Sequence, residues 1–257
     1  TDVPVPKTYG LCEDDDVAGT AFFVMDFLDG DLFWDPMIPS MTNSDRTEIY
    51  KNKNKTLAKL HSVDYKNIGL EDYGKPGNYV ARQVSRWSKQ YRASETDNIE
   101  AMNNLIEWLP KNIPDDDETT IVHGDYRLDN MILRNNEVIG ILDWELSTLG
   151  HPIADFSYHC LSWRTQEAFW DEAKLKELGI PSEKEYMEMY CKYSGKDLSK
   201  NWEFYMAFNM FKIAGILQGI LGRVRDGTAA SKHAEERGNM VFPLSQAAWE
   251  TIEDNFL

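Results

Sequence analysis

The sequence is poor in cysteine and in basic residues, and each shortage narrows the class of protein. The three cysteines, Cys12, Cys160 and Cys191, are too few and too scattered for a disulfide framework or a CxxC zinc site, and they favour a reducing, cytoplasmic setting. Lysine and arginine together number 27 against 43 acidic residues, which gives a formal net charge of −16. That balance argues against nucleic acid as a partner, because phosphate backbones are held by clustered basic side chains.

Several common enzyme motifs are also missing. The chain contains no GxxxxGK[ST], GxGxxG, GxSxG or HExxH segment, and its five histidines show no metal-ligand spacing. These absences argue against P-loop nucleotide hydrolases, dinucleotide-binding folds, α/β-hydrolases and zinc proteases. The most apolar stretch, residues 202–221, contains Glu203, Asn209 and Lys212, so we expect a buried helix rather than a membrane span.

The residues that are present indicate an α+β chain in which helices predominate. Its 257 residues, 42% hydrophobic and 12% aromatic, are enough for one large core or two smaller lobes. The aromatic and β-branched run Thr20–Phe27 predicts a buried strand that ends in a turn at residues 28–30. Pro243 is expected to break or kink a helix that starts near Ala229. The expected helices run from N-cap candidates at Thr42–Ser44 to His61, over Asn78–Arg92 and Asn98–Leu109, around Tyr186–Tyr193, and onward from Trp202.

The middle of the chain carries three short β-type runs and a dense group of polar residues. Thr119–Val122, Met131–Leu133 and Glu137–Leu142 are expected to be strands, and the Asn135-Asn136 pair a hairpin turn, because Asn tolerates positive φ. The polar segment HGDYRLDN, residues 123–130, lies between the first two runs. We therefore expect a small sheet with polar side chains at one end.

Asp125, Asn130 and Asp143 have the residue types and the spacing that phosphoryl transfer requires. That reaction needs a carboxylate to orient the attacking hydroxyl and accept its proton, and a magnesium ion to neutralise charge on the phosphates. Magnesium prefers hard oxygen ligands, which Asp and Asn supply. Taken singly, each residue also fits a bland role as a turn cap, a local backbone partner or the start of a loop. Their joint placement at strand ends favours one base and two metal ligands.

The segment IVHGDYRLDNMIL, followed by VIGILDWE, resembles the catalytic and metal-binding loops of the aminoglycoside phosphotransferase family, within the protein-kinase-like superfold. The resemblance implies that Asp125 is the catalytic base, that Asn130 and Asp143 are magnesium ligands, and that ATP is the phosphate donor. His123 would be a structural member of the loop. Asp155, in the segment GHPIADF, would brace the loop through hydrogen bonds.

The same resemblance implies a division of the chain. Residues 1–30 would be the remnant of a truncated N-terminal lobe together with the hinge, and residues 31–257 a mainly helical C-terminal lobe with a small catalytic β-hairpin. Met25 would lie at the back of an adenine pocket, and backbone groups of Asp26 and Leu28 would pair with adenine. An ordinary core strand explains the aromatic residues of this segment equally well.

Longer segments are similar to the kinase-like domains fused to acyl-CoA dehydrogenases in animals and to stand-alone bacterial relatives. They are LAKLHSVD, YGKPGNYVARQVSRWSKQYRASET and LDWELSTLGHPIADFSYHC, and the resemblance covers nearly the whole chain. It implies a hydroxyacyl acceptor such as a hydroxyacyl-CoA, whose phosphates or carboxylate would contact Arg82, Arg86, Trp87 and Arg127. A helix with a solvated basic face explains the helical arginines equally well.

These patterns predict a magnesium- and ATP-dependent kinase for a small hydroxylated metabolite, with hydroxyacyl-CoA the favoured class. An aminoglycoside kinase is the alternative within the enzyme class, since an acidic protein suits a cationic antibiotic. A non-catalytic, kinase-like module that binds nucleotide or a partner is the alternative outside it. The expected partner is a small molecule, without nucleic acid or membrane, and a fused or partner domain stays open.

Overall fold

The structure, a computed structural model, describes residues 1–229 and 231–257, which fall into two compact units. Unit 1 comprises residues 1–63, 125–147 and 168–196, and unit 2 comprises residues 64–124, 148–167 and 197–257. Each unit therefore joins segments that are far apart in the sequence. The strands of the described residues form three two-stranded antiparallel sheets, and most of the remaining elements are helices.

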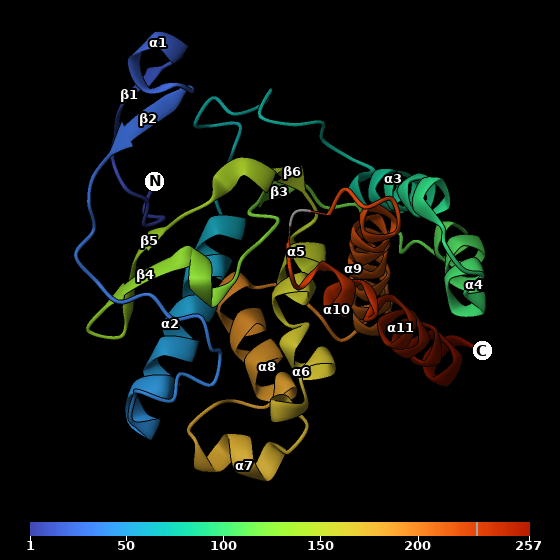
Figure 1. Ribbon diagram of the computed structural model, residues 1–257. Helices are drawn as coiled ribbons and strands as arrows, with labels where there is room; N and C mark the ends of the chain where they lie inside the picture. Colours follow the sequence, from blue (N-terminus) through green and yellow to red (C-terminus); the bar gives the residue numbers. More distant parts are fainter. Residues whose placement is uncertain (230) are drawn as a thin grey trace. The chain divides into compact units, whose positions relative to one another are not determined.

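Figure 1 shows the elements in chain order, with η denoting a 3₁₀ helix. Unit 1 contains β1 (Thr8–Cys12), α1 (Asp15–Ala18), β2 (Phe22–Met25), α2 (Asn43–His61), η2 (Leu128–Asn130), β4 (Met131–Arg134), β5 (Glu137–Ile141), η3 (Trp144–Leu146), α7 (Glu172–Glu177) and α8 (Glu183–Ser194). Unit 2 contains α3 (Tyr79–Ser94), α4 (Glu100–Trp108), η1 (Leu109–Lys111), β3 (Thr120–Val122), β6 (Thr148–Gly150), α5 (Pro152–His159), α6 (Ser162–Thr165), α9 (Trp202–Arg225), α10 (Ala234–Gly238) and α11 (Val241–Phe256).

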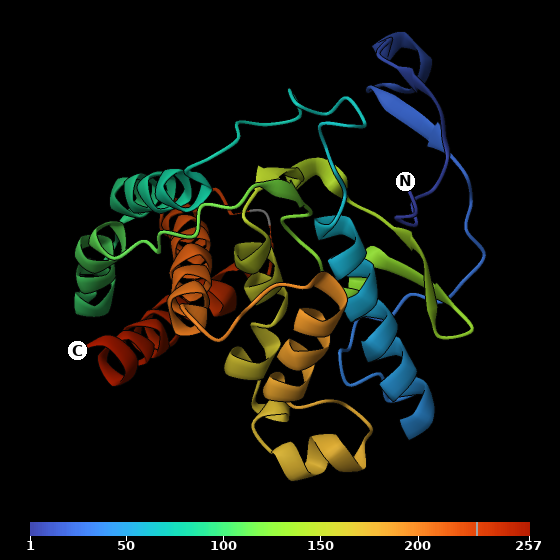
Figure 2. The same cartoon turned by 180° about the vertical axis from the view of Figure 1, so that it is seen from behind.

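Unit 1 is organised around α2 and α8, which lie side by side in both views (Figures 1 and 2). Helix α2 begins as the sequence predicts, because the Thr42 side chain accepts a hydrogen bond from the backbone N–H of Asp45. The rings of Tyr50 and Tyr186 meet edge to face with centroids 5.9 Å apart. Asn54 donates its amide to the carbonyl oxygen of Tyr186 at 2.8 Å. These contacts hold α2 against α8, so α2 offers a stable surface to the β4–β5 hairpin.

The predicted β4–β5 hairpin is confirmed, and its turn is fastened to α2. Asn135 and Asn136 have φ values of 52° and 66°, as a two-residue turn of this kind requires. The Asn136 side chain donates to the Asp45 carboxylate at 2.7 Å, and Asn52 donates to the Asn136 carbonyl oxygen at 3.1 Å. Helix α2 therefore sets where the hairpin lies in unit 1.

The expectation of one small sheet from three successive runs is wrong. Strand β3 pairs with β6, with Ile121 opposite Leu149. Strands β4 and β5 pair with each other, and among the described residues their one further pairing is an isolated bridge between Asp31 and Leu133 of β4. Strand β6 is only three residues long, so it offers too little periodicity to be recognised from the sequence.

The strand expected within residues 20–27 exists, but its predicted burial is wrong. It covers residues 22–25 as β2, pairs antiparallel with β1, and leaves Phe23, Val24 and Met25 exposed. A two-stranded hairpin has no second layer of its own, so its apolar side chains stay at the surface unless another element covers them.

Unit 2 is built around α9, against which α3, α5, α10 and α11 pack. Figure 2 shows α9 between α3 and α11. Gly215 of α9 lies against α3, where a Cβ would be 3.6 Å from the carbonyl oxygen of Trp87, an ordinary van der Waals contact. By length and composition α9 could cross a membrane, but 67% of its most apolar window is buried inside the structure, in agreement with the expected buried helix.

Pro243 does not break the helix that contains it. It is the third residue of α11, which begins at Val241. The first N–H groups of a helix have no partner within the helix, so a proline there removes no hydrogen bond. Pro243 therefore belongs to the start of α11 rather than to the end of an earlier helix.

His151 is a buried link inside unit 2, between β6 and α5. Its Nε2 lies 2.5 Å from the backbone carbonyl oxygen of Asp116, which can only accept, so we assign the proton to Nε2. Its ring stacks on Tyr205 with centroids 5.0 Å apart, and the Tyr205 hydroxyl donates to the Asp116 carboxylate at 2.7 Å. Burial lowers the pKa of His151, while the contacts with Asp116 oppose that shift.

Acidification is expected to destabilise the protein through His151. The unfolded chain protonates this residue near its ordinary pKa of about 6.5. The folded protein holds it neutral, so stability that is full above that pH is lost as the pH falls towards the lower folded pKa. Relative to the non-titrating variant His151→Gln, the wild type should lose up to about 1.4 kcal/mol per pH unit in this window. Denaturant unfolding at several pH values measures the difference, and parallel pH profiles would contradict a neutral His151.

Candidate active site

The predicted base, Asp125, is held from within its own loop by Asn130. The Asn130 side-chain amide donates from Nδ2 to the backbone oxygen of Asp125 at 2.9 Å and to its carboxylate Oδ2 at 3.2 Å. The turn that makes this possible is η2, in which the N–H of Asn130 donates to the carbonyl oxygen of Arg127 at 3.1 Å. The two residues that the sequence places five positions apart thus face each other, with the carboxylate partly exposed.

Arg127 contacts two carboxylates of the same loop. Its Nε lies 3.4 Å from Oδ1 of Asp125, and its Nη2 lies 2.6 Å from Oδ2 of Asp129. The Asp125 carboxylate therefore has Asn130 on one oxygen and Arg127 on the other. Arg127, predicted to contact the substrate, thus contacts the predicted base.

Asp143 follows β5 at a point where the backbone turns sharply. Its φ and ψ are both 61°, the left-handed region that Asp and Asn enter more readily than most residues. Its side chain makes no capping hydrogen bond with η3 and is exposed. The preceding residue, Leu142, donates its N–H to the backbone oxygen of Asn130 at 2.9 Å. The end of β5 is thereby tied to the loop that carries Asn130.

The oxygens of Asn130 and Asp143 suit a magnesium ion. Both hydrogen bonds of the Asn130 amide are donated by its nitrogen. The amide oxygen, Oδ1, is not used in them, and it is the kind of ligand that magnesium prefers. Asp143 adds a carboxylate. Within the described part of the chain no group of three or more His, Cys, Asp or Glu side chains could hold a metal ion. This pair instead fits magnesium bound by few protein ligands and completed by phosphate oxygens and water.

Asp155 lies directly beneath the start of the catalytic loop in unit 2. Its Oδ2 accepts the N–H of His123 and its Oδ1 accepts the N–H of Gly124, both at 2.8 Å. Gly124 has a φ of 85°, which a residue with a side chain rarely adopts. Asp155 is buried at the start of α5, so both carboxylate oxygens are committed to the two residues that precede Asp125.

Tyr126 is a loop anchor that our sequence analysis missed. It is fully buried, and its hydroxyl donates to the backbone oxygen of Lys53 in α2 at 2.8 Å. A tyrosine within an otherwise polar motif is the signal that could have revealed it, because its ring seeks burial while its hydroxyl seeks a partner. The loop is therefore fixed to the main helix of unit 1 immediately after Asp125.

The predicted hinge residues lie at the end of the β1–β2 hairpin and just after it. Met25 is the last residue of β2, and Asp26 and Leu28 follow it. The N–H of Asp26 donates to the carbonyl oxygen of Lys7 at 2.8 Å, and its carboxylate accepts the Tyr9 hydroxyl. Among the described residues, no backbone bond uses the Asp26 carbonyl or the Leu28 N–H, so both remain available to a ligand. The Leu28 side chain packs over Gly140 of β5, and the Met25 side chain is exposed.

Gly30 is a second position that we did not predict. It lies where the predicted hinge segment, residues 26–31, pairs with β4 of the β4–β5 hairpin. Asp31 and Leu133 exchange two backbone hydrogen bonds, of 2.7 and 2.9 Å. A Cβ on Gly30 would lie 2.5 Å from the Leu133 carbonyl oxygen and 2.7 Å from Cγ2 of Ile132. Because the first of these atoms is backbone, the pairing has no room for a larger residue.

We expect Gly30→Ala to destabilise the protein by about 1–3 kcal/mol, as forced overpacking does. Gly10→Ala, in β1, is the control, since a Cβ at Gly10 meets nothing within 4 Å. Denaturant unfolding of the two variants gives the comparison. Equal stability of the two variants would show that the backbone at Gly30 does not approach β4 as closely as described.

Three of the four residues predicted to contact the substrate, Arg82, Arg86 and Trp87, lie on α3 in unit 2, and they separate into two groups. Trp87 is 9% exposed, packs on Gly215 of α9, and donates its indole N–H to Gln83 at 2.9 Å. Arg82 and Arg86 instead line a shallow, nearly flat hollow that this one helix forms. Trp87 thus belongs to the core of the unit, whereas the two arginines lie at its surface.

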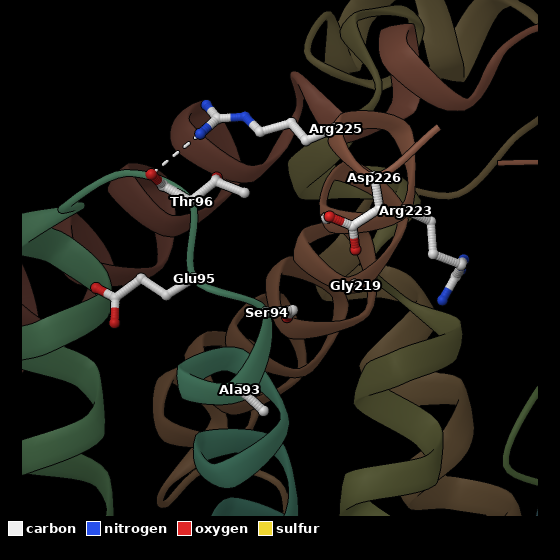
Figure 3. A pocket seen from close by; sticks show the side chains of 9 residues that line it. Ala93, Ser94, Glu95, Thr96, Gly219, Arg223, Arg225 and Asp226 are labelled. Carbon is white, nitrogen blue, oxygen red and sulfur yellow. Dashed lines mark hydrogen bonds between the residues drawn. The ribbon is translucent and has the colours of Figure 1, made fainter. Parts of the chain in front are cut away.

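A second hollow, of about 420 Å³, lies where α3 and α9 end (Figure 3). Figure 3 shows Glu95 and Asp226 among its lining residues together with Arg223 and Arg225. Arg225 is already engaged, because it donates to the carbonyl oxygen of Thr96 at 3.0 Å and pairs with Asp97. A helix of 16 residues is about 24 Å long. This hollow is therefore remote from β6, which packs near the opposite end of α3.

An amide that holds a carboxylate, in a loop tied by its backbone to the end of a strand that a second carboxylate follows, agrees with the arrangement expected from the sequence. Residues 1–190 match the model of the phosphotransferase enzyme family. The chain belongs to this family, whose members have a kinase-like fold.

The curated relatives are larger proteins. The chain is 44% identical over 255 residues to acyl-CoA dehydrogenase family member 10 of Mus musculus, which covers 96% of the chain and 24% of that protein. It is 40% identical over 260 residues to acyl-CoA dehydrogenase family member 11 of Homo sapiens, with 98% and 33% covered. It is 42% identical over 269 residues to the probable acyl-CoA dehydrogenase IBR3 of Arabidopsis thaliana, with 96% and 32% covered. The chain thus spans a quarter to a third of these relatives.

Solved structures share the fold. A provisionally assigned aminoglycoside phosphotransferase from Ralstonia eutropha JMP134 superposes with a TM-score of 0.92 at 48% identity, over 99% of this chain and 79% of that one. A thermostable mutant of the aminoglycoside phosphotransferase APH(4)-Ia, in ternary complex with ADP and hygromycin B, gives a TM-score of 0.64 at 10% identity, over 98% and 78%. The predicted kinase-like fold is confirmed by these matches, as a mostly helical chain with small antiparallel sheets.

Proposed function

We propose that this chain is a magnesium- and ATP-dependent O-phosphotransferase that acts on a small hydroxylated acceptor, with hydroxyacyl-CoA as the acceptor class. The observation that carries the proposal is the contact of one Asn130 nitrogen with both the backbone and the carboxylate of Asp125. It fixes the base and leaves the amide oxygen for a metal. Membership of the phosphotransferase enzyme family supports the same reaction class.

In this proposal Asp125 orients the acceptor hydroxyl and takes its proton as the oxygen attacks the γ-phosphorus of ATP, while the bond from that phosphorus to the bridging oxygen breaks and ADP leaves. Asn130 and Asp143 would hold a magnesium ion, which would neutralise charge on the phosphates. Arg127 keeps the carboxylate of Asp125 in place, and Asp155 positions the backbone that leads into it. The protein thus contributes mainly position and charge, which is what phosphoryl transfer requires.

The adenine is proposed to bind at residues 26–30, the segment that follows β2. The free backbone groups of Asp26 and Leu28 supply an acceptor and a donor there, and Met25 lies beside them. In the APH(4)-Ia complex ADP is bound to a protein of the same fold, which supports a nucleotide site in this chain without locating it.

The acceptor class rests on two supports. Relatives at 40–44% identity carry the name of acyl-CoA dehydrogenase family members, so a chain of this kind occurs within proteins named for acyl-CoA chemistry. The open hollow on α3 is lined by basic residues, which suit the phosphates of an acyl-CoA.

An aminoglycoside kinase is the second candidate, favoured by the likeness to aminoglycoside phosphotransferases and by the net charge of −16. An ADP-release assay with a panel of hydroxyacyl-CoAs and aminoglycosides separates the two. Turnover of an aminoglycoside with none of any hydroxyacyl-CoA would reverse our preference. Turnover of no acceptor, together with nucleotide binding, would support the non-catalytic alternative.

Loss of the Asp143 carboxylate is expected to abolish the magnesium dependence of nucleotide binding. Asp143→Asn keeps a residue that tolerates the left-handed backbone, so the unliganded protein should melt as the wild type does. Saturating Mg-ATP should stabilise the wild type by roughly 2–4 kcal/mol, and the variant by much less. Glu145→Gln, two residues on and exposed, is the control that should keep the full shift. An unchanged shift in Asp143→Asn would remove Asp143 from the metal site.

A further inference from the structure

The hollow at the ends of α3 and α9 lies wholly within unit 2, and the proposed phosphate transfer uses none of its residues (Figure 3). One wall is formed by residues 93–96, and the other by side chains and backbone from residues 219–226. Its volume of about 420 Å³ is within the range of small-molecule sites. The glycines and the charged side chains of the two walls indicate what kind of molecule it accepts.

The α9 wall contains two glycines that packing against α3 does not require. A Cβ on Gly219 would lie 3.5 Å from its nearest neighbour, Nε2 of Gln90, and a Cβ on Gly222 would lie 3.5 Å from Ser94. These are ordinary van der Waals distances, so alanine fits at both positions. Glycine is less favourable than alanine inside a helix, because it loses more backbone freedom on folding. The two glycines therefore weaken the helix and keep the hollow open.

Two side chains of opposite charge in the α9 wall, Arg223 and Asp226, are available to a ligand. Among the described residues, neither the Arg223 guanidinium nor the Asp226 carboxylate takes part in a hydrogen bond or an ion pair. Figure 3 shows both at the end of α9, beside the hollow. The other charged side chains of the walls, Glu95 and Arg225, are paired with residues outside the hollow. The hollow thus presents a guanidinium and a carboxylate to one bound molecule.

The end of α3 adds acceptor groups to the same hollow. Gln218 of α9 is fully buried and donates to the Ser94 carbonyl oxygen at 2.6 Å, so this helix end is fixed in place. In the described part of the chain, no backbone N–H beyond the helix bonds the Ala93 carbonyl oxygen. The C-terminal end of a helix carries partial negative charge, which favours a positively charged group. An ammonium group is therefore stabilised between this end and Asp226, and a carboxylate at Arg223.

We propose that this hollow binds a small zwitterion, a molecule that carries an ammonium and a carboxylate a few bonds apart, of the class of free amino acids. Arg223 binds the carboxylate, and Asp226 together with the end of α3 binds the ammonium. A simple anion or a simple cation would leave one of the two charged side chains without a partner. The proposal does not rest on the proposed function, since it involves neither the catalytic loop nor its brace.

Saturation-transfer NMR with each of the common free amino acids tests the site without any turnover. At least one of them should bind the wild type. For the amino acid that binds most tightly, Asp226→Asn and Arg223→Gln should each weaken binding by roughly tenfold or more in calorimetry, since a charge-assisted hydrogen bond is worth about that factor. Two analogues of that amino acid, one without the ammonium and one without the carboxylate, should bind at least about tenfold more weakly than the parent.

The variant Gly219→Ala/Gly222→Ala separates filling of the hollow from loss of folding. It should melt no lower than the wild type, because alanine favours the helix and fits against α3, and yet it should bind the amino acid much more weakly. The controls are Glu235→Gln and Arg237→Gln, which remove the same two charges from exposed positions of α10. Both should bind the amino acid as the wild type does.

Binding of no free amino acid to the wild type would overturn the proposal. The same conclusion would follow if the Asp226 and Arg223 variants bound as tightly as the two controls. Equal affinity for an analogue that lacks one charged group would show that the hollow does not recognise a zwitterion.

Discussion

Asp125→Asn is expected to reduce kcat by about 100- to 10,000-fold, the usual contribution of a general base. The amide keeps an oxygen for the Asn130 side chain, so the loop geometry should survive while the proton acceptor is lost. The KM for ATP and the melting temperature should stay close to the wild-type values. Steady-state kinetics with a hydroxyacyl-CoA acceptor measure the effect.

Asp129→Asn is the control for this variant. It removes an equal charge four residues along, from a carboxylate that contacts Arg127 rather than the acceptor. The Arg127 side of this ion pair is half exposed, and pairs open to solvent contribute little, so we expect nearly wild-type kinetics. If Asp125→Asn turned over as fast as Asp129→Asn, Asp125 would not be the base.

Asp155→Asn is expected to lower both stability and kcat. Asp155 accepts the N–H groups of His123 and Gly124, and the amide nitrogen of Asn cannot accept either. Loss of one bond to a buried carboxylate should cost about 1.5–3 kcal/mol of unfolding free energy. Displacement of Asp125 by a fraction of an ångström should lower kcat by about 100-fold, with little change in the KM for ATP.

Asp116→Asn separates positioning from stability. Asp116 also accepts a hydrogen bond in unit 2, from the Tyr205 hydroxyl, but it does not contact the catalytic loop in any described bond. Its variant should be destabilised and keep kcat. A parallel loss of rate in Asp116→Asn and Asp155→Asn would reduce Asp155 to a purely structural residue.

Candidates for the site were easier to select from the sequence than the fold around them. Asp125, Asn130 and Asp143 could be selected because chemistry restricts both their types and their spacing, and two consecutive asparagines correctly indicated the hairpin between Asn130 and Asp143. Strand β6 could not, since three residues show no period, and the exposure of β2 could not, since a strand's own residues do not say what covers them.

The supporting contacts were the hardest to foresee. Gly30 matters only because a backbone oxygen of Leu133 approaches it, and Tyr126 only because Lys53 of α2 presents a carbonyl oxygen. Both depend on segments about 70 to 100 residues away in the chain. Local sequence patterns carry no information about such pairs, whereas the basic residues of α3 were visible in the sequence but fitted a ligand site and a solvated face equally well.

The most direct test of the account is identification of the reaction product by ³¹P NMR. The purified protein is incubated with Mg-ATP and a hydroxyacyl-CoA, and the spectrum is followed over time. We expect a new phosphate monoester on the acyl hydroxyl, formed in step with ADP and dependent on magnesium. ADP formation without an ester, or an ester formed on an aminoglycoside but on no hydroxyacyl-CoA, would contradict the account.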